Sequence, residues 1–123
     1  MLVRPKVIEF IKIQHGDRFR VIDNTGEDKK VVAGQFPDII IMQKEPPPNT
    51  NTLFVLKIEE PEENLLDRIP EWQALGSTPS VLYIVIQKNK LDEAKKLASA
   101  TGVRTRFAWY EMEGENVKQV QYE

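Results

Sequence analysis

The sequence predicts a single α/β domain in which a mixed central β-sheet is flanked by helices on both faces. Long apolar segments alternate with helical segments in the second half of the chain, a pattern typical of such sheets. The segment VLYIVI at 81–86 is apolar throughout, as in strands that parallel pairing buries on both faces. The 123 residues suit one modest hydrophobic core. No repeat or linker divides the range 1–123, which is therefore expected to form one domain.

The first elements expected are a helix and two strands joined by a turn. Apolar residues at helical spacing predict a helix over 3–14, with Pro5 in its first turn and Gly16 at its exit. Apolar and charged residues alternate in DRFRVID, which predicts a half-buried strand at 17–23. The turn-forming sequence NTGED then leads into a returning strand, KKVVAG at 29–34.

The next two strands are expected to lie in the centre of the sheet. FPDIIIMQ carries four consecutive apolar residues at 39–42, so this strand is apolar on both faces. KEPPPNTN at 44–51 contains three consecutive prolines, which exclude regular structure and predict an extended loop. TLFVLKIEE at 52–60 forms the second central strand, and Pro61 ends it.

Helices and strands alternate through the second half of the chain. The segment 62–76 is helical in pattern, but Pro70 must kink it or split it in two. After the strand at 81–86, KNKLDEAKKLASATG at 88–102 is the clearest helix, with acidic residues in its first turn and a terminal glycine. The strands VRTRFAWYEM and VKQVQY, joined by the turn EGEN, form a closing hairpin at 103–122.

Composition excludes several kinds of site. The chain has no cysteine, which excludes disulfides, thiolate metal sites and cysteine nucleophiles. Its one histidine, His15, excludes a site that needs two, and we expect it to be exposed at a helix end. The formal net charge of −2 argues against a strongly cationic nucleic-acid binder. MLVRPKVIEF lacks a signal-peptide run and no membrane span is apparent, which predicts a cytoplasmic protein without a membrane partner.

A small set of polar residues accompanies the central strands. Pro37 and Asp38 open one strand, Lys57 lies near the end of the next, and Glu9 lies on the first helix. These residues occur within EFI, FPDIIIM and LFVLKIE, which are followed by a helix, by VLYIVI and by LDEAKKLASATGV. In this order the chain resembles the PD-(D/E)xK, or restriction endonuclease-like, nuclease superfamily over most of its length. The resemblance implies that superfamily's αβββαβ core, here with an extra C-terminal hairpin.

The resemblance also implies a magnesium-dependent site. In that superfamily the strand-opening aspartate and the acidic residue of the D/E-x-K element bind Mg²⁺, while the lysine positions or activates the attacking water. Asp38 and Lys57 match those positions here, and Glu9 matches a glutamate that is common on the first helix. Phosphodiester cleavage builds negative charge, which a divalent cation held by hard oxygen ligands stabilises.

The D/E-x-K element departs from the pattern at one position. Val55 stands where an acidic residue is expected, and valine cannot ligate a metal. Glu59 is one replacement, because side chains two apart on a strand share a face with Lys57. It lies four residues beyond Val55, however, or roughly 13 Å at about 3.3 Å per residue. We therefore expect a degenerate site with Asp38, Lys57 and Glu59 as catalytic residues and Asp38, Glu59 and Glu9 as metal ligands.

Each of these residues also has a structural interpretation. Asp38 is of a type common in turns at strand starts. Lys57 and Glu59 would form a solvated strand end that blocks edge aggregation, and Glu9 would be an exposed helix residue. Trp72 resembles a polar-aromatic position near the site of some nucleases, yet core packing under a kinked helix is the interpretation we favour.

Basic residues offer a second route to nucleic acid. They gather on the first strand, its predicted hairpin partner, the strand at 103–112 and the last helix: Arg18, Arg20, Lys29, Lys30, Arg104, Arg106, Lys88, Lys90, Lys95 and Lys96. They would either frame a nucleic-acid groove or form the solvated halves of amphipathic elements, and we favour the second interpretation. The acidic run EEPEEN would repel phosphate from the side of the expected site.

Two functions follow as expectations. The first is a nuclease-like domain that processes or binds nucleic acid through a degenerate or weakened Mg²⁺-dependent phosphodiesterase site, so that catalysis is not its expected role. The second is a non-catalytic interaction module on the same fold. Its late hairpin at 103–122 would be the natural edge for a homodimer.

Overall fold

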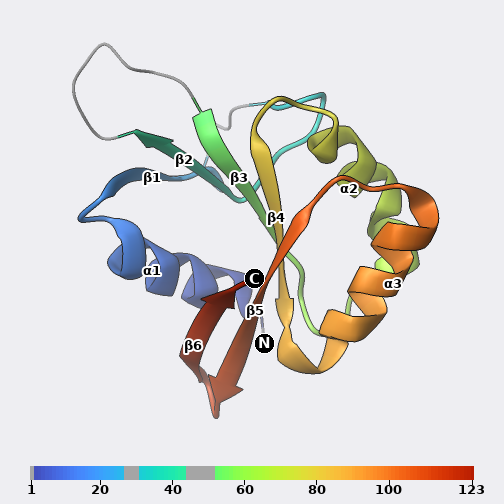
Figure 1. The fold of residues 1–123 in the computed structure, drawn as a ribbon. Helices are drawn as coiled ribbons and strands as arrows, with labels where there is room; N and C mark the ends of the chain where they lie inside the picture. Colours follow the sequence, from blue (N-terminus) through green and yellow to red (C-terminus); the bar gives the residue numbers. More distant parts are fainter. Residues whose placement is uncertain (1, 27–30, 44–51) are drawn as a thin grey trace.

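The computed structural model describes residues 2–26, 31–43 and 52–123. Within these residues a six-stranded sheet forms the centre of the molecule (Figure 1), and its strands lie side by side in chain order: β1 (Phe19–Asp23), β2 (Ile39–Gln43), β3 (Thr52–Ile58), β4 (Val81–Gln87), β5 (Arg106–Glu113) and β6 (Asn116–Tyr122). The pairs β1–β2, β2–β3 and β5–β6 are antiparallel, whereas β3–β4 and β4–β5 are parallel. The mixed sheet and the parallel pairing of 81–86 are confirmed.

Helices cover both faces of this sheet, as the sequence predicts. In the described part of the chain, α1 (Arg4–His15) lies on one face and α2 (Ile69–Gly76) and α3 (Leu91–Thr101) lie on the other (Figure 1). Short 3₁₀ turns, η1 (Leu65–Arg68) and η2 (Lys88–Lys90), lead into α2 and α3. No helix in the described ranges is long and apolar enough to cross a membrane.

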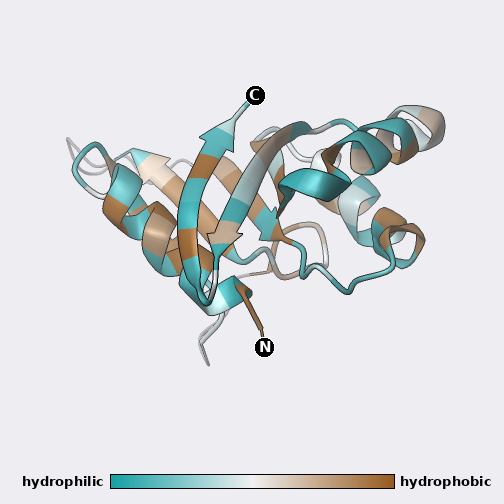
Figure 2. Ribbon diagram, turned by 90° about the horizontal axis from the view of Figure 1, so that it is seen from below, coloured by the Kyte–Doolittle hydropathy of each residue, from teal (hydrophilic) through white to brown (hydrophobic). Residues whose placement is uncertain are grey.

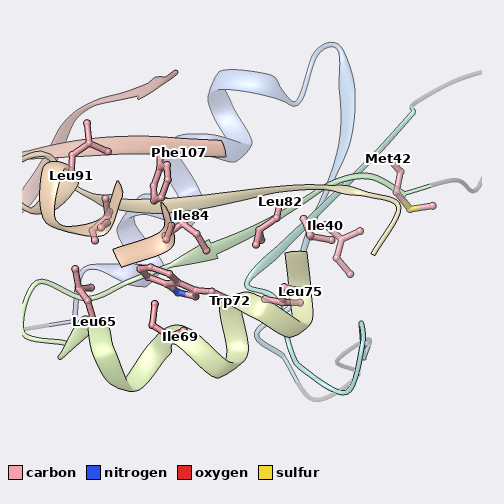
Figure 3. Close-up of a cluster of buried hydrophobic side chains, with 14 residues drawn as sticks. Ile40, Met42, Leu65, Ile69, Trp72, Leu75, Leu82, Ile84, Leu91 and Phe107 are labelled. Carbon is pink, nitrogen blue, oxygen red and sulfur yellow. The ribbon is translucent and has the colours of Figure 1, made fainter. Parts of the chain in front are cut away.

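The sheet separates two hydrophobic cores. Helices α2 and α3 bury the first, in which Trp72 and Leu75 point from α2 toward Leu82 and Ile84 on β4 (Figure 3). Helix α1 buries the second core, where its Ile11 joins residues of β2 to β6. Strand β6 takes part with one face only, because hydrophilic and hydrophobic residues alternate along it (Figure 2). The central strand β2 contributes to both cores, since all four of its residues 39–42 are buried.

Proline and glycine set the helix boundaries in the second half. Pro70 falls in the first turn of α2, and the residues before it form η1 instead of continuing the helix, so the predicted split is confirmed. Gly102 ends α3 in the left-handed conformation with φ 72°. Gly76 ends α2 where the chain passes close to another segment, because a Cβ added there would lie 2.5 Å from the Arg104 carbonyl oxygen.

The returning strand expected at 29–34 is wrong for the residues that the structure describes. Residues 32–35 form a tight turn, in which Val32 makes only an isolated bridge to Gln35. Ala33 and Gly34 both have positive φ, 51° and 77°, which a strand cannot accommodate. Strand β1 pairs directly with β2 instead, so the observed order has one strand fewer than expected. Residues 27–30 and the loop expected at 44–51 lie outside the described residues.

His15 also differs from its expected place. It ends α1 as the sequence predicts, but its ring is half-buried, because it contacts Phe19 of β1 and Tyr122 of β6. The exposed helix-end interpretation is therefore wrong.

Candidate functional site

The antiparallel pairing of β2 and β3 brings Asp38 opposite Lys57. Ile39 pairs with Leu56, and the Asp38 N–H donates to the Leu56 carbonyl at 2.9 Å, which continues the ladder by one residue. The Asp38 carboxylate accepts a hydrogen bond from the Ile58 N–H at 2.7 Å. Its Oδ2 lies 3.8 Å from Lys57 Nζ. The two residues that the resemblance singles out therefore converge at one end of the central strands.

Lys57 makes a closer ion pair with a residue that the sequence analysis missed. Its Nζ lies 3.0 Å from Glu71 Oε1, in the first turn of α2, and donates to the Phe36 carbonyl at 3.3 Å. Its side chain is only 11% exposed, so the ammonium depends on these partners. The sequence shows only that Glu71 is an acidic residue directly after Pro70, which is typical of the first turn of a helix. Its place beside Lys57 follows from the packing of α2 on β3.

Glu59 lies just after β3 and is completely buried. Its Oε1 accepts from Trp72 Nε1 at 3.1 Å and its Oε2 accepts from Arg68 Nε at 2.9 Å. Its backbone carbonyl accepts from the Tyr110 hydroxyl at 2.8 Å. Both carboxylate oxygens are thus committed to side chains of η1 and α2. Trp72 is fully buried in the core as favoured, and its indole N–H holds this carboxylate.

One structural alternative from the sequence is wrong and another holds. Lys57 and Glu59 do not form a solvated strand end, because they are 9% and 0% exposed. The helices that cover this face of the sheet remove them from water. Glu9, by contrast, is exposed on α1 and pairs with Lys12 at 3.3 Å, as its structural interpretation expects. Within the described residues Glu9 makes an ion pair only with its helical neighbour, so it takes no part in the cluster at Lys57.

Arg4 is a further member of the site that the sequence analysis missed. Its Nε lies 3.2 Å from Asp38 Oδ1, and its guanidinium donates to the Ile58 carbonyl at 2.9 Å. The backbone N–H groups of Val3 and Arg4 donate to the Glu60 carboxylate at 2.7 and 3.0 Å. Glu60 therefore accepts hydrogen bonds from backbone N–H groups that have no partner within α1, and it places Arg4 beside Asp38.

The ion pairs form one continuous chain of alternating charge. It runs Arg4–Asp38–Lys57–Glu71–Arg68–Glu59, so three cations face three carboxylates. The pair of Arg68 with Glu71 links two helical neighbours. No buried side-chain nitrogen or oxygen in the described residues lacks a hydrogen-bond partner. We call this set of six residues the charge network.

Burial dominates the titration of its carboxylates. It raises the pKa of Asp38, although Lys57 and Arg4 oppose the shift. Burial likewise raises the pKa of Glu59, against the hydrogen bond from Trp72 and the charge of Arg68. The cations therefore offset the cost of burying these carboxylates only in part.

The network offers a magnesium ion few ligands. Val55, at the position of the missing acid, is fully buried in the core, where it pairs with Ile40. Within the described residues no three His, Asp or Glu side chains are arranged to hold a metal ion. Asp38 and Glu71 are the two carboxylates that meet at Lys57, and Mg²⁺ binding through one or two carboxylates and several waters is common. These two residues are the ones that would hold a magnesium ion here, and the ion would stabilise charge on a phosphate oxygen.

The basic residues are mostly exposed and dispersed. Arg18 and Arg20 lie on and before β1, and Arg104 and Arg106 line a cavity of about 440 Å³ beside the loop at 76–80. Lys88 lies over the Trp109 ring, 4.8 Å from its centroid. Lys29 and Lys30 lie outside the described residues.

Comparison with protein-family models, curated proteins and solved structures found no match to this chain.

Proposed function

We propose that this chain is a nuclease-like domain that binds nucleic acid and has a degenerate magnesium site with little or no cleavage. One observation carries the proposal: Asp38 and Lys57, from adjacent central strands, meet a third ionisable residue, Glu71, at one end of the sheet. The order α1-β1-β2-β3-α2-β4 also agrees with the αβββαβ order that the sequence resemblance implies.

The charge network gives a physical reason for weak catalysis. Both carboxylate oxygens of Asp38 and of Glu71 already contact a cation, so a magnesium ion would have to compete with these contacts. Lys57 would stand beside an attacking water only if it left its contact with Glu71. Val55 supplies no third carboxylate. We therefore expect the side chains to hold one another more strongly than they hold a magnesium ion.

The test measures nucleic-acid binding and cleavage separately. Fluorescence anisotropy with labelled single- and double-stranded DNA and RNA should show binding that weakens as salt increases, because phosphate contacts release counterions. Incubation of the same nucleic acids with Mg²⁺ or Mn²⁺ should leave them almost intact. No binding to any of them at micromolar protein would refute the nucleic-acid role.

Matched variants identify the source of any cleavage. Efficient cleavage that needs metal and disappears in Asp38→Asn, Lys57→Met and Glu71→Gln would refute the degenerate site and show an active one. Glu9→Gln is the control, because Glu9 is exposed on the other face of the sheet. Cleavage that survives all three substitutions would come from a contaminant or from another site, and would not support the proposed one.

The edge position of β6 favours a second candidate function, self-association. Strand β6 is the last in the sheet, and Gln14 of α1 donates to the Val120 carbonyl at 3.0 Å, which marks the side of β6 that faces away from β5. A second copy of the chain could add its own strand along this side.

A further inference from the structure

A ring of five aromatic side chains surrounds a cavity on the face of the sheet that carries α1. The cavity has a volume of about 270 Å³. The ring, which we call the aromatic ring, comprises His15, Phe19, Phe54, Tyr83 and Tyr122. These residues come from the end of α1 and from β1, β3, β4 and β6, so five separate elements build the wall.

Each member of the aromatic ring contacts the next, and the last contacts the first. Going round from His15 to Phe19, Phe54, Tyr83, Tyr122 and back to His15, the ring centroids are 6.4, 6.2, 5.9, 5.4 and 5.1 Å apart. The interplanar angles lie between 54° and 89°, which is the tilted or edge-to-face geometry that aromatic pairs prefer. The closed set of contacts holds the walls in place before any ligand arrives.

The floor and walls of the cavity are almost entirely carbon. Ile41 and Leu56, both buried, form the floor. The Tyr122 hydroxyl donates to Gln14 Oε1 at 3.1 Å, whereas no hydrogen bond to the Tyr83 hydroxyl is found in the described residues. Burial and the nearby charge of Arg18 lower the pKa of His15, so its imidazole is neutral at pH 7. The cavity therefore presents an uncharged and almost wholly apolar surface.

Size and charge together restrict the ligand. An apolar cavity of roughly 150 Å³ accepts benzene, while pockets for drug-sized ligands start at about 300 Å³. A volume of 270 Å³ therefore suits one or two fused rings. Aromatic residues can also bind cations, but no carboxylate among the described residues lines this cavity, and the charge that acts on His15 is the cation Arg18.

We propose that the cavity inside the aromatic ring binds a neutral planar compound of one or two rings. The ligand would contact the faces and edges of the surrounding rings and the apolar floor of the cavity. A nucleobase is planar but has several polar groups that would lose their water without replacement, so it would bind more weakly than indole. The cavity shares no residue with the charge network, so this inference does not depend on the proposed nucleic-acid role.

A titration with three probes tests the ligand class. The full chain, labelled with ¹⁵N, is titrated with indole, adenine and tetramethylammonium, and amide chemical shifts are recorded. Indole should give saturable shifts confined to the elements that carry the aromatic ring, with the tightest binding of the three. If tetramethylammonium binds as tightly as indole, the proposal that the ligand is neutral is overturned. If adenine binds more tightly than indole, the proposal that the ligand is largely apolar is overturned. Absence of saturable indole shifts at millimolar concentration would overturn the site.

Variants of the floor and wall test the location. Ile41→Phe places a larger side chain in the floor and so fills part of the cavity. It should weaken indole binding at least about tenfold, a loss of about 1.4 kcal/mol. Phe54→Leu, at a half-buried wall position, removes one ring but keeps the fold and should also weaken binding. Trp109→Phe is the control, because Trp109 packs against the other core. Unchanged indole binding in a folded Ile41→Phe or Phe54→Leu protein, judged by its dispersed spectrum, would overturn the location.

Discussion

Lys57 shows how a buried charge is tolerated in this protein. Its ammonium lies between the carboxylates of Asp38 and Glu71 and also donates to the Phe36 carbonyl. Each carboxylate has a second cation, because Arg4 contacts Asp38 and Arg68 contacts Glu71. Removing the lysine would therefore weaken both pairs without leaving either carboxylate alone.

Substitution of Lys57 by Met tests this compensation. Breaking a buried ion pair costs about 3–5 kcal/mol, and the remaining arginines should reduce the loss of unfolding free energy to about 2–3 kcal/mol. Urea unfolding at pH 7 measures the difference. Lys12→Met is the matched control, since Lys12 is 40% exposed in its side chain and pairs only at the surface. Equal losses in the two variants would show that the buried pairs contribute no more than surface ones.

The raised pKa of Glu59 predicts an unusual dependence of stability on pH. Because its folded pKa lies above the unfolded value of about 4.3, the folded protein binds this proton more tightly. The stability linked to Glu59 is greatest below the unfolded pKa and falls as pH rises through the folded pKa. Glu59→Gln removes this titration, so the variant should gain stability relative to the wild type between about pH 4 and neutrality. Urea unfolding across that range checks it; a relative loss with rising pH would contradict the shift.

Among the elements, α1 depends on a residue far away in sequence. Val3 at its N-cap makes no side-chain capping bond, and the Glu60 carboxylate accepts from the backbone N–H groups of Val3 and Arg4 instead. A carboxylate at this end also interacts favourably with the helix dipole. The end of β3 and the start of α1 are thereby joined.

Loss of this remote cap should destabilise the protein. We expect Glu60→Ala to lower the unfolding free energy by about 1–2 kcal/mol and Glu60→Gln to lower it less, because an amide oxygen can still accept. Chemical denaturation measures both. Glu62→Ala serves as the control, since Glu62 is exposed. If Glu62→Ala lowers the unfolding free energy as much as Glu60→Ala does, the effect comes from the loss of a negative charge and not from the loss of a helix cap.

The end of α2 provides a steric test of element packing. An added methyl at Gly76 would meet the Arg104 carbonyl oxygen at 2.5 Å, and this neighbour is backbone that cannot rotate away. Gly76→Ala should therefore cost about 1–3 kcal/mol, although alanine favours helices. At Gly26 an added Cβ meets nothing within 4 Å, so Gly26→Ala should be close to neutral. Thermal unfolding of both variants measures the contrast, and equal melting temperatures would show that the backbone at 104 moves aside.

At the scale of the whole molecule, the edge position of β6 predicts how copies would associate. Lys118 is exposed and lies at the bulge of β6, between the pairs Glu111–Gln119 and Met112–Val117, which is a position in an edge strand that accepts proline. If the chain dimerises along β6, Lys118→Pro should convert a dimer to a monomer, because it removes an edge donor. Analytical ultracentrifugation at micromolar concentration measures the mass. A wild-type monomer would contradict self-association, and a dimer that survives the substitution would place the interface elsewhere.

Much of the architecture was predictable because it depends on local patterns. The apolar run at 39–42, the continuous strand at 81–86 and the αL glycine Gly102 each determine a nearby element, and all three are confirmed. The prediction of a strand at 29–34 was wrong for the described residues. The apolar pair at 31–32 leads into a turn, because Ala33 and Gly34 have positive φ. The strand propensity of the two valines at 31–32 therefore did not decide the conformation of this segment.

The candidate site was predictable only in part. The family resemblance placed Asp38 and Lys57 in one site, and they do lie together, because they are opposite each other at the ends of adjacent antiparallel strands. It did not reveal Arg4, Arg68 or Glu71, because ion pairs between distant elements depend on how helices pack on the sheet. The burial of Glu59 was missed for the same reason.

The sequence by itself determined the α/β class, the central strands and the absence of an acidic residue at Val55, because these depend on residue type and short-range spacing. Tertiary structure alone decided that the polar ends of β2 and β3 become a buried, self-paired charge network and that five aromatic residues close around a cavity. Side chains from separate elements meet only when the sheet and helices fix their distances, and burial then sets which charges must be paired.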